Sequence, residues 1–195
     1  DRTWRSGDEV LISFDFTPRV WAGEQEAAGT VSVYRGPLLF AYDARFNDLN
    51  PDELPRIVPS DIALTDVPRE GALAPWVRAT LASNGARYTV CDLASAGQTG
   101  NHYRSWLPAD KLPPSPFHLE KAEGGTLKWS SRAGAERWKV SIATDRAFTK
   151  PIIVESKEPN VTPKLEPGHY FWTVTAVNAH GHTDAANGPW ELIVR

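Results

Sequence analysis

The sequence of 195 residues has no methionine, a single cysteine and no strong excess of either charge. A disulfide needs two cysteines, so Cys91 cannot form one within the chain, and the redox compartment stays open. The formal net charge of −3 gives no reason to expect nucleic acid or an anionic membrane as a partner. No apolar run approaches the ~20 residues that span a bilayer, and we expect no signal peptide within these residues. Because the chain also lacks an initiator methionine, we expect it to be a piece of a longer polypeptide.

Glycine and proline, by contrast, are plentiful. The chain has 14 glycines, 16 prolines and 41% apolar residues, a composition typical of a loop-rich globular β protein. Its length suits one large domain or two small ones, each able to bury a core. We find no internal repeat and no low-complexity tract.

Apolar residues alternate with polar ones over two segments near the start of the chain. From Glu9 to Phe16 every second residue is apolar, which predicts a half-buried strand. From Thr30 to Tyr42 the same period recurs on both sides of Gly36-Pro37. Because proline has no N–H to donate, this dipeptide predicts a bend within one long strand. The small-residue segment from Trp21 to Gly29 predicts a loop between the two.

Further strands follow within the first 111 residues. Arg45 to Asp66 contains three prolines and predicts a coil across the outside of the fold. Two strand-like runs, Trp76 to Leu81 and Arg87 to Leu93, flank Asn84-Gly85. These two residues tolerate positive φ and therefore predict a hairpin. The whole pattern is typical of a β-sandwich.

Two short motifs in this region carry a family resemblance. They are Trp4-Arg5-Ser6-Gly7-Asp8-Glu9-Val10 and Arg35-Gly36-Pro37-Leu38-Leu39-Phe40-Ala41. With them, residues 1–107 resemble the region just after the catalytic barrel in glycoside hydrolase family 127, the β-L-arabinofuranosidase-like enzymes. The resemblance implies a jelly-roll-like β-sandwich at 1–111, with Tyr103 to Leu107 as its final strand. It also implies a helical barrel that carries a catalytic Glu and zinc-binding cysteines. This chain has no cysteine cluster, so that machinery is expected in an N-terminal catalytic barrel of the same polypeptide, outside this sequence.

Leu112-Pro113-Pro114-Ser115-Pro116 is the clearest boundary in the chain and predicts an extended, semi-rigid linker at 112–116. After it, about seven short strand-like runs occupy 117–195, a spacing that predicts a Greek-key sandwich. This second domain resembles a bacterial fibronectin type III module, an immunoglobulin-like β-sandwich. The resemblance implies a buried Trp129 on the second strand and a corner tyrosine at Tyr170.

Carboxylates are numerous, but none stands in a recognisable acid/base setting. Glycoside hydrolysis needs two carboxylates about 5–10 Å apart across a substrate. Solvated or turn-capping roles explain the acids of the first domain better. We therefore predict no catalytic residue and no cofactor in this chain. The acids considered are Asp8, Asp15, Glu24, Glu26, Asp43 and Asp92.

Two further groups have a chemical and a plainer interpretation. Cys91 would be a nucleophile if a His and a carboxylate converged on it, but its place within a strand run favours a buried small hydrophobe. Asp48, Asn50 and Asp52 alternate like the start of a calcium loop. Pro51 interrupts them, and the glycine and closing glutamate of that motif are missing, so an acidic loop is favoured.

His180 and His182, with Asp184 nearby, have a spacing that can bind a metal, but a third ligand is only a guess. A polar loop before the last strand explains these residues as well. No Ser-His-Asp signature, P-loop or dinucleotide-binding glycine pattern is present. We predict no metal site.

Eight tryptophans are many for this length. Three lie inside strand runs of the second domain and predict core positions: Trp129, Trp138 and Trp172. Three others lie at loop or strand ends, where an exposed ring can stack on a sugar or anchor an interface. These are the candidate carbohydrate or interdomain contacts: Trp21, Trp76 and Trp106.

The sequence therefore predicts an all-β, non-catalytic C-terminal accessory region of a bacterial glycoside hydrolase, secreted or at the cell surface. Its expected partners are the catalytic barrel and polysaccharide. A free-standing carbohydrate-binding or adhesion module of an exported protein is the main alternative, and a small hydrolase in its own right is a third. A long helical domain upstream of Asp1 would separate the first interpretation from the second. Activity of the 195 residues alone would be needed for the third.

Overall fold

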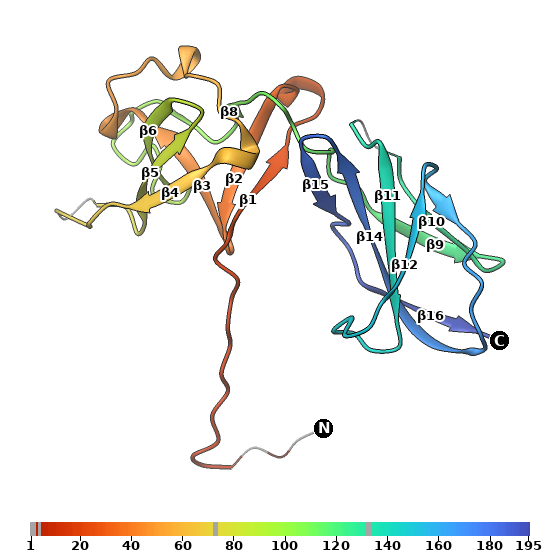
Figure 1. The fold of residues 1–195 in the computed structure, drawn as a ribbon. Helices are drawn as coiled ribbons and strands as arrows, with labels where there is room; N and C mark the ends of the chain where they lie inside the picture. Colours follow the sequence, from red (N-terminus) through yellow and green to blue (C-terminus); the bar gives the residue numbers. More distant parts are fainter. Residues whose placement is uncertain (1–2, 4, 72–73, 132–133) are drawn as a thin grey trace.

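The computed structural model describes residue 3 and residues 5–71, 74–131 and 134–195. Trp4 of the first family-like motif lies outside them. The described chain consists of antiparallel sheets, and its only helices are four 3-10 turns of three residues each. The predicted all-β class is confirmed (Figure 1).

One eight-stranded sheet holds the strands of residues 18–108, in the order β1-β2-β3-β6-β5-β4. The short strands β7 and β8 pair with β3 and β2. Arg35 of β2 meets Asp66 of β4 at 2.6 Å, although three strands separate β2 from β4 in the sheet, so the sheet curls around its own core. We call this part the N-terminal sheet. Its strands are β1 (Pro18–Ala22), β2 (Thr30–Arg35), β3 (Leu38–Asp43), β4 (Ala63–Asp66), β5 (Arg78–Ser83), β6 (Ala86–Asp92), β7 (Tyr103–Arg104) and β8 (Leu107–Pro108).

The prediction of one long strand from Thr30 to Tyr42 is wrong. Gly36 and Pro37 form a tight turn, and β2 and β3 pair antiparallel, with Arg35 opposite Leu38. Gly36 has a φ of +57°, a conformation that glycine adopts without steric cost. Pro37 therefore lies in the hairpin turn between β2 and β3, where the hydrogen bonds of the sheet do not require an N–H.

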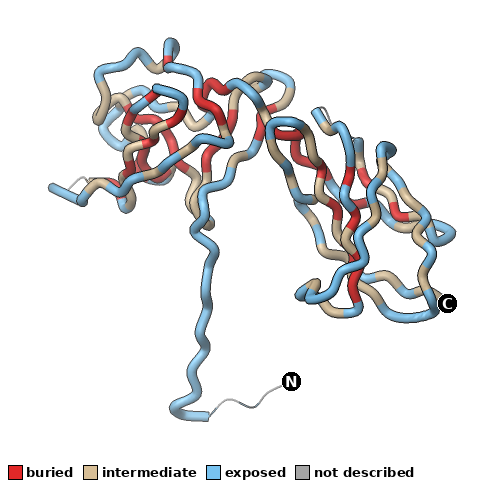
Figure 2. The backbone as a smooth tube through the Cα atoms, in the orientation of Figure 1, coloured by how far each residue is buried: buried red, intermediate tan, exposed pale blue. Residues whose placement is uncertain are grey.

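The predicted strand from Glu9 to Phe16 is also absent. Residues 8–17 are extended but pair with no strand among the described residues, and their side chains lie open to solvent. This segment projects from the fold as a pale-blue tube in Figure 2. We call residues 5–17 the arm. The first strand begins only at Pro18, so Trp21 lies in β1 rather than in the predicted loop.

The predicted hairpin at Asn84-Gly85 is confirmed. These two residues connect β5 to β6 with φ values of +48° and +81°. Asparagine and glycine tolerate this left-handed conformation, which the short hairpin turn requires.

The segment from Ala44 to Ile62 covers the core of the N-terminal sheet. It contains η2 (Ala44–Phe46), η3 (Pro51–Glu53) and η4 (Pro59–Asp61) and is otherwise coil, as predicted. The prediction of coil as far as Asp66 is wrong, because Ala63 to Asp66 form β4 and pair with β5. The Ser83 hydroxyl binds both the N–H and the C=O of Val58, at 2.8 and 2.9 Å, and so holds the segment on β5. The fully buried residues beneath it include Val31, Val33, Phe40, Tyr42, Ile57, Leu81, Val90 and Leu107.

Two facing sheets form the second half, which we call the C-terminal sandwich. One has the order β13-β10-β9, and the other has β12-β11-β14-β15 with β16 also paired to β14. The predicted strand runs are confirmed, and β15 is an addition that the sequence did not predict. The strands are β9 (Leu119–Glu123), β10 (Thr126–Trp129), β11 (Arg137–Ala143), β12 (Ile152–Ser156), β13 (Asn160–Val161), β14 (Gly168–Asn178), β15 (Gly181–Asp184) and β16 (Trp190–Val194).

Tryptophan rings fill this second core. Trp129, Trp138 and Trp172 are 2%, 3% and 1% exposed, as predicted for all three. Trp138 packs edge-on against Phe117 with 4.8 Å between ring centroids. The Tyr170 hydroxyl donates to the Glu166 carbonyl at 3.1 Å, a back-bond to a residue four positions earlier in the chain.

The proline-rich linker is extended but not exposed. Pro113, Pro114, Ser115 and Pro116 are all buried. Thr183 of β15 donates to the Pro114 carbonyl at 2.5 Å, and the Asn178 amide donates to the Leu112 carbonyl at 3.1 Å. Backbone hydrogen bonds join Ile57 with Pro108 and Asp110 just before the linker. The domain boundary at 112–116 stays a prediction, but the linker itself is held at both ends.

Candidate functional site

A cleft of about 520 Å³ lies where the N-terminal sheet meets the C-terminal sandwich. One wall is β1 together with η4, the other is β15 with the residues that follow it, and Pro113 lies between them. Cavities of this size are typical of small-molecule sites. The cleft is therefore the first candidate site of the described chain.

The β1 wall presents one aromatic ring and one guanidinium. Arg19 and Trp21 are two residues apart in a strand and so share a face, while Val20 between them packs toward the core. Trp21 is 42% exposed. The Arg19 guanidinium lies 5.4 Å from the centroid of the Tyr34 ring, which is on the neighbouring strand. Pro59 and Ile62 of the segment beside β1 extend this wall with apolar surface.

The β15 wall is more polar. His182 and Asp184 are two residues apart on this strand, so they also share a face, and His180 lies in the turn that leads into it. The Asp184 carboxylate accepts a hydrogen bond from the Thr175 hydroxyl at 2.6 Å. The two histidines and Asp184 thus belong to a strand and a turn that line the cleft, rather than to the predicted polar loop. Among the described residues no group of three or more His, Cys, Asp or Glu is arranged to hold a metal ion.

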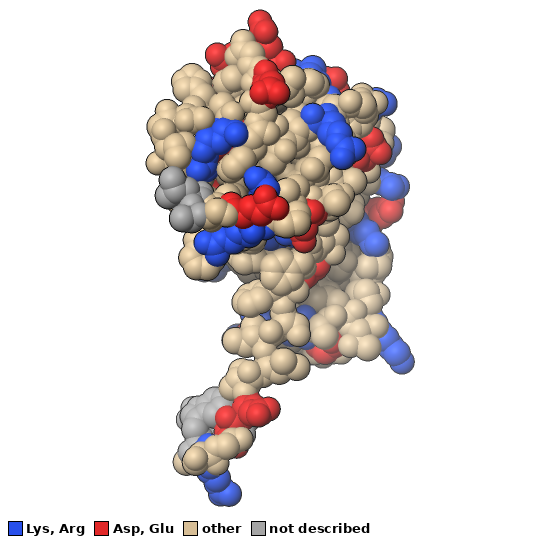
Figure 3. All heavy atoms as spheres, turned by 90° about the vertical axis from the view of Figure 1, so that its left-hand side faces the viewer, with Lys and Arg blue, Asp and Glu red and all other residues tan. Residues whose placement is uncertain are grey.

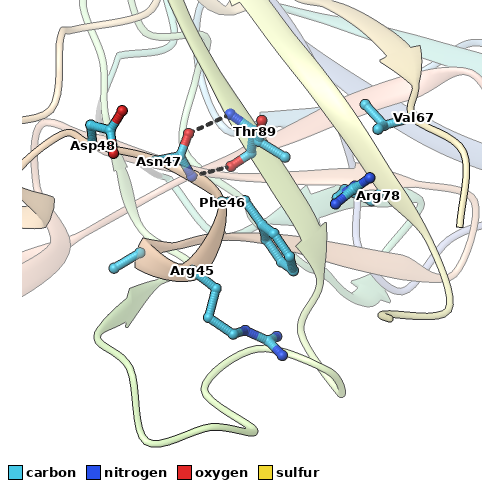
Figure 4. A pocket seen from close by; sticks show the side chains of 8 residues that line it. Arg45, Phe46, Asn47, Asp48, Val67, Arg78 and Thr89 are labelled. Carbon is cyan, nitrogen blue, oxygen red and sulfur yellow. Dashed lines mark hydrogen bonds between the residues drawn. The ribbon is translucent and has the colours of Figure 1, made fainter. Parts of the chain in front are cut away.

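A second hollow, of about 340 Å³, surrounds Phe46 (Figure 4). The guanidiniums of Arg45 and Arg78 lie 4.8 and 5.2 Å from the centroid of its ring. The Asn47 side chain binds the backbone of Thr89 twice, donating to its C=O at 2.9 Å and accepting from its N–H at 2.7 Å. Because these groups bind one another, they join the segment after β3 to β5 and β6, and the hollow has a structural role rather than that of an open binding site.

Asp43 and Arg45 form a buried ion pair beside this hollow. The carboxylate is fully buried, and Arg45 Nη2 lies 2.9 Å from it. Burial alone would raise the pKa of Asp43, but hydrogen bonds from Arg45 and from the Gly97 amide outweigh it and hold the pKa below its ordinary value. Arg45 also donates to the Ser95 carbonyl at 2.7 Å. The pair therefore ties the glycine-rich loop after β6 to the end of β3.

Two neighbours of this pair also have structural roles. The Asp92 carboxylate, 3% exposed, accepts from the amides of Val77 and Ser95, at 3.0 Å each. Cys91 is buried in β6 as predicted, and burial, with help from nearby Asp43 and Asp92, raises the pKa of its thiol to about 12. A thiol with so high a pKa is a poor nucleophile at neutral pH.

The three candidate tryptophans are all exposed, at 42% for Trp21, 75% for Trp76 and 37% for Trp106. Trp21 lies opposite Ser32 in the β1–β2 ladder, and the Ser32 hydroxyl donates to the Ser105 carbonyl at 3.4 Å. Trp21 and Trp106 therefore lie on either side of Ser32. Trp76 is elsewhere, just before β5, with the Arg69 guanidinium 5.4 Å from its ring. Of the three, Trp21 lines the cleft.

Charge is mixed on the face of the N-terminal sheet seen in Figure 3, where Lys and Arg alternate with Asp and Glu. No helix of the described residues is long and apolar enough to cross a bilayer. The chain matches no protein-family model and no curated protein sequence.

Sequence reasoning named the residues of both cleft walls but not the cleft. Trp21 and His180, His182 and Asp184 were considered separately because about 160 residues lie between them. The alternation of His182 and Asp184 after β14 is the signal that would have placed them on a strand.

Proposed function

We propose that this chain is the non-catalytic C-terminal accessory region of an arabinofuranosidase-like glycoside hydrolase, docked against an N-terminal catalytic barrel of the same polypeptide. The observation that carries the proposal is the exposed, apolar arm in front of β1.

The arm presents large apolar side chains that a folded surface normally covers. Val10, Ile12, Phe14 and Phe16 are 63%, 68%, 62% and 51% exposed, and their spacing puts them on one face of an extended chain. Contiguous apolar patches of this kind mark interaction sites. The backbone beside them is also free of strand partners in the described chain, and such a segment can add to the edge of another sheet or lie in a groove.

The base of the arm contacts the N-terminal sheet. Phe16 packs against the β2–β3 turn so closely that a Cβ on Gly36 would come within 3.0 Å of its ring. Arg5 and Asp8 close a turn near the other end, with Arg5 N 2.8 Å from the Asp8 carboxylate. The arm thus includes most of the first family-like motif, and the resemblance implies that the barrel directly precedes this motif. Interfaces between domains of one chain typically bury ~600–1,500 Å².

The buried acids of the N-terminal sheet support a structural rather than a catalytic role. Asp43 and Asp92 are held by an arginine and by backbone amides. Neither acid lines the cleft or the Phe46 hollow. The strand order of the C-terminal sandwich and the Tyr170 back-bond likewise support a fibronectin type III-like module.

The main alternative is a free-standing carbohydrate-binding or adhesion module. Trp21 in a cleft beside His182 and Asp184 favours a glycan contact. This alternative does not explain why the arm exposes large apolar side chains, and we therefore prefer the accessory region.

The test uses the reading frame upstream of Asp1, which should encode a helical barrel. That barrel, expressed alone, should be less stable, and adding the 195-residue chain should raise its melting temperature. Replacing Ile12 and Phe14 together with serine should abolish the rescue, because both lie on the apolar face of the arm. Leu11→Ser is the matched control, since Leu11 is 93% exposed on the opposite face. A barrel that is equally stable alone, or that responds equally to both variants, would overturn the proposal.

A further inference from the structure

We propose that the cleft between β1 and β15 binds an uncharged oligosaccharide, with Trp21 as the stacking platform and His182 and Asp184 as the hydroxyl-binding groups. The inference rests on a glycan contact, which the alternative function above requires and the accessory region allows, and it names both the place and the class of sugar.

Trp21 has the position that a sugar platform needs. Its ring belongs to the outer face of an edge strand, is 42% exposed, and lines a concave site rather than a convex surface. The backbone of β1 holds it through pairing with β2, Trp21 lying opposite Ser32. An indole offers a large apolar surface at little entropic cost, which suits the C–H face of a pyranose ring.

The β15 wall supplies polar groups, since His182 and Asp184 both line the cleft. Asp184 accepts one hydrogen bond, from Thr175, and a carboxylate has room for several more. His182 is exposed on the same face of β15 and can donate or accept through its ring nitrogens. A carboxylate and an imidazole opposite an aromatic ring can bind sugar hydroxyls while the ring covers the apolar face.

The charges of the cleft favour an uncharged ligand. Arg19 on the β1 wall and Asp184 on the β15 wall offset each other. An anionic sugar would gain from Arg19 and lose against Asp184, so the site has no strong preference for either sign. The hydroxyl groups of a neutral sugar meet no such conflict.

The cleft is formed before any ligand arrives. Pro113 is buried between the walls, and a Cβ on Gly181 would lie 3.4 Å from its ring. The Thr183 hydroxyl donates to the Pro114 carbonyl and so holds β15 on the linker. A preformed site avoids the entropic cost of ordering its walls on binding.

The experiment titrates the complete chain with xylohexaose, cellohexaose and arabinohexaose, and with hexagalacturonate as the charged counterpart. Binding is followed by calorimetry and by the indole N–H signals in the NMR spectrum. We expect at least one neutral hexasaccharide to shift the Trp21 signal at millimolar concentration, and hexagalacturonate to bind more weakly. Trp21→Ala should weaken binding by about tenfold or more, which corresponds to about 1.4 kcal/mol. Asp184→Asn should weaken it less, and its unchanged melting temperature would exclude unfolding as the cause.

Trp76→Ala is the control, because Trp76 is 75% exposed and lies outside the cleft. Equal losses for Trp21→Ala and Trp76→Ala would overturn the proposal, as would the absence of any shift with all four sugars or tighter binding of hexagalacturonate. These outcomes are separable from a failure of barrel docking, since docking is measured with arm variants and sugar binding with cleft variants.

Discussion

The N-terminal sheet and the C-terminal sandwich stabilise their interiors in different ways. The N-terminal core contains the fully buried carboxylate of Asp43, paired with Arg45, and the nearly buried Asp92. The C-terminal core is built around Trp129, Trp138 and Trp172, and no Asp, Glu, Lys or Arg is buried among its described residues. The comparison teaches that the first half adds a buried ion pair to its apolar packing, whereas the second relies on ring packing, so different perturbations should separate them.

The largest expected effect is from removing one ring of the second core. Trp172 is 1% exposed and packs edge-on against Trp190. Trp172→Ala should destabilise the C-terminal sandwich by about 3–5 kcal/mol, since it removes a large buried side chain and leaves a cavity. Thermal unfolding followed by NMR should show the sandwich melting first while signals of the N-terminal sheet persist. Simultaneous loss of both halves would mean that the two cores are not independent, and Trp76→Ala serves as the exposed control.

The corresponding change in the first core is Asp43→Asn. It leaves the Arg45 guanidinium without its counter-charge, and breaking a buried pair from one side costs about 3 kcal/mol. Chemical denaturation should show a loss confined to the N-terminal sheet. Glu123→Gln is the control, because its ion pair with Lys128 is exposed and contributes little. If the two variants lose the same stability, the buried pair is not what distinguishes the first core.

Acid should also destabilise the N-terminal sheet more than the C-terminal sandwich, but by less than Asp43→Asn does. The pKa of Asp43 is lower in the folded chain than its ordinary value of 3.8. Its stabilising effect is therefore complete above that value and is lost as the pH falls through the lower, folded pKa. We expect the unfolding free energy of the N-terminal sheet to fall below pH 3.8 more steeply than that of the sandwich. Asp43→Asn should flatten this difference; an unchanged profile would contradict it.

The smallest effect concerns a single hydrogen bond of the sandwich. Tyr170→Phe removes the hydroxyl that donates to Glu166 and should lower the stability of the sandwich by about 1 kcal/mol. Tyr103→Phe is the matched control, because Tyr103 is 53% exposed and its hydroxyl makes no hydrogen bond with the described residues. Equal melting temperatures for the two variants would show that the corner contributes nothing.

Local signals predicted most of the fold. Asn84-Gly85 specified a hairpin because both residues accept positive φ, and the periodic tryptophans of the second domain specified its core. The arm shows the limit of such reasoning. Its alternation from Val10 to Phe16 is that of a strand, but periodicity records which face is apolar and not whether a partner strand is at hand.

The errors around β2 and the cleft have a different cause. Gly36-Pro37 is compatible with a bend or with a turn, and the choice depends on whether Leu38 to Asp43 pairs back onto β2. The cleft depends on contacts between segments about 160 residues apart. A short stretch of sequence does not show which strands pair or which distant segments come into contact. The candidate site could therefore be predicted only as separate residues.

The buried linker has a mechanical consequence. Two domains on a flexible tether tumble separately, each with the short rotational correlation time of a particle of about half the mass. Because Pro113 to Pro116 are packed and bonded to β15, and the residues before them are bonded to Ile57, the 21.5 kDa chain should reorient as one elongated body. A force or a torque applied at one end of the chain would then be transmitted to the other end, because the linker between the two halves cannot bend freely.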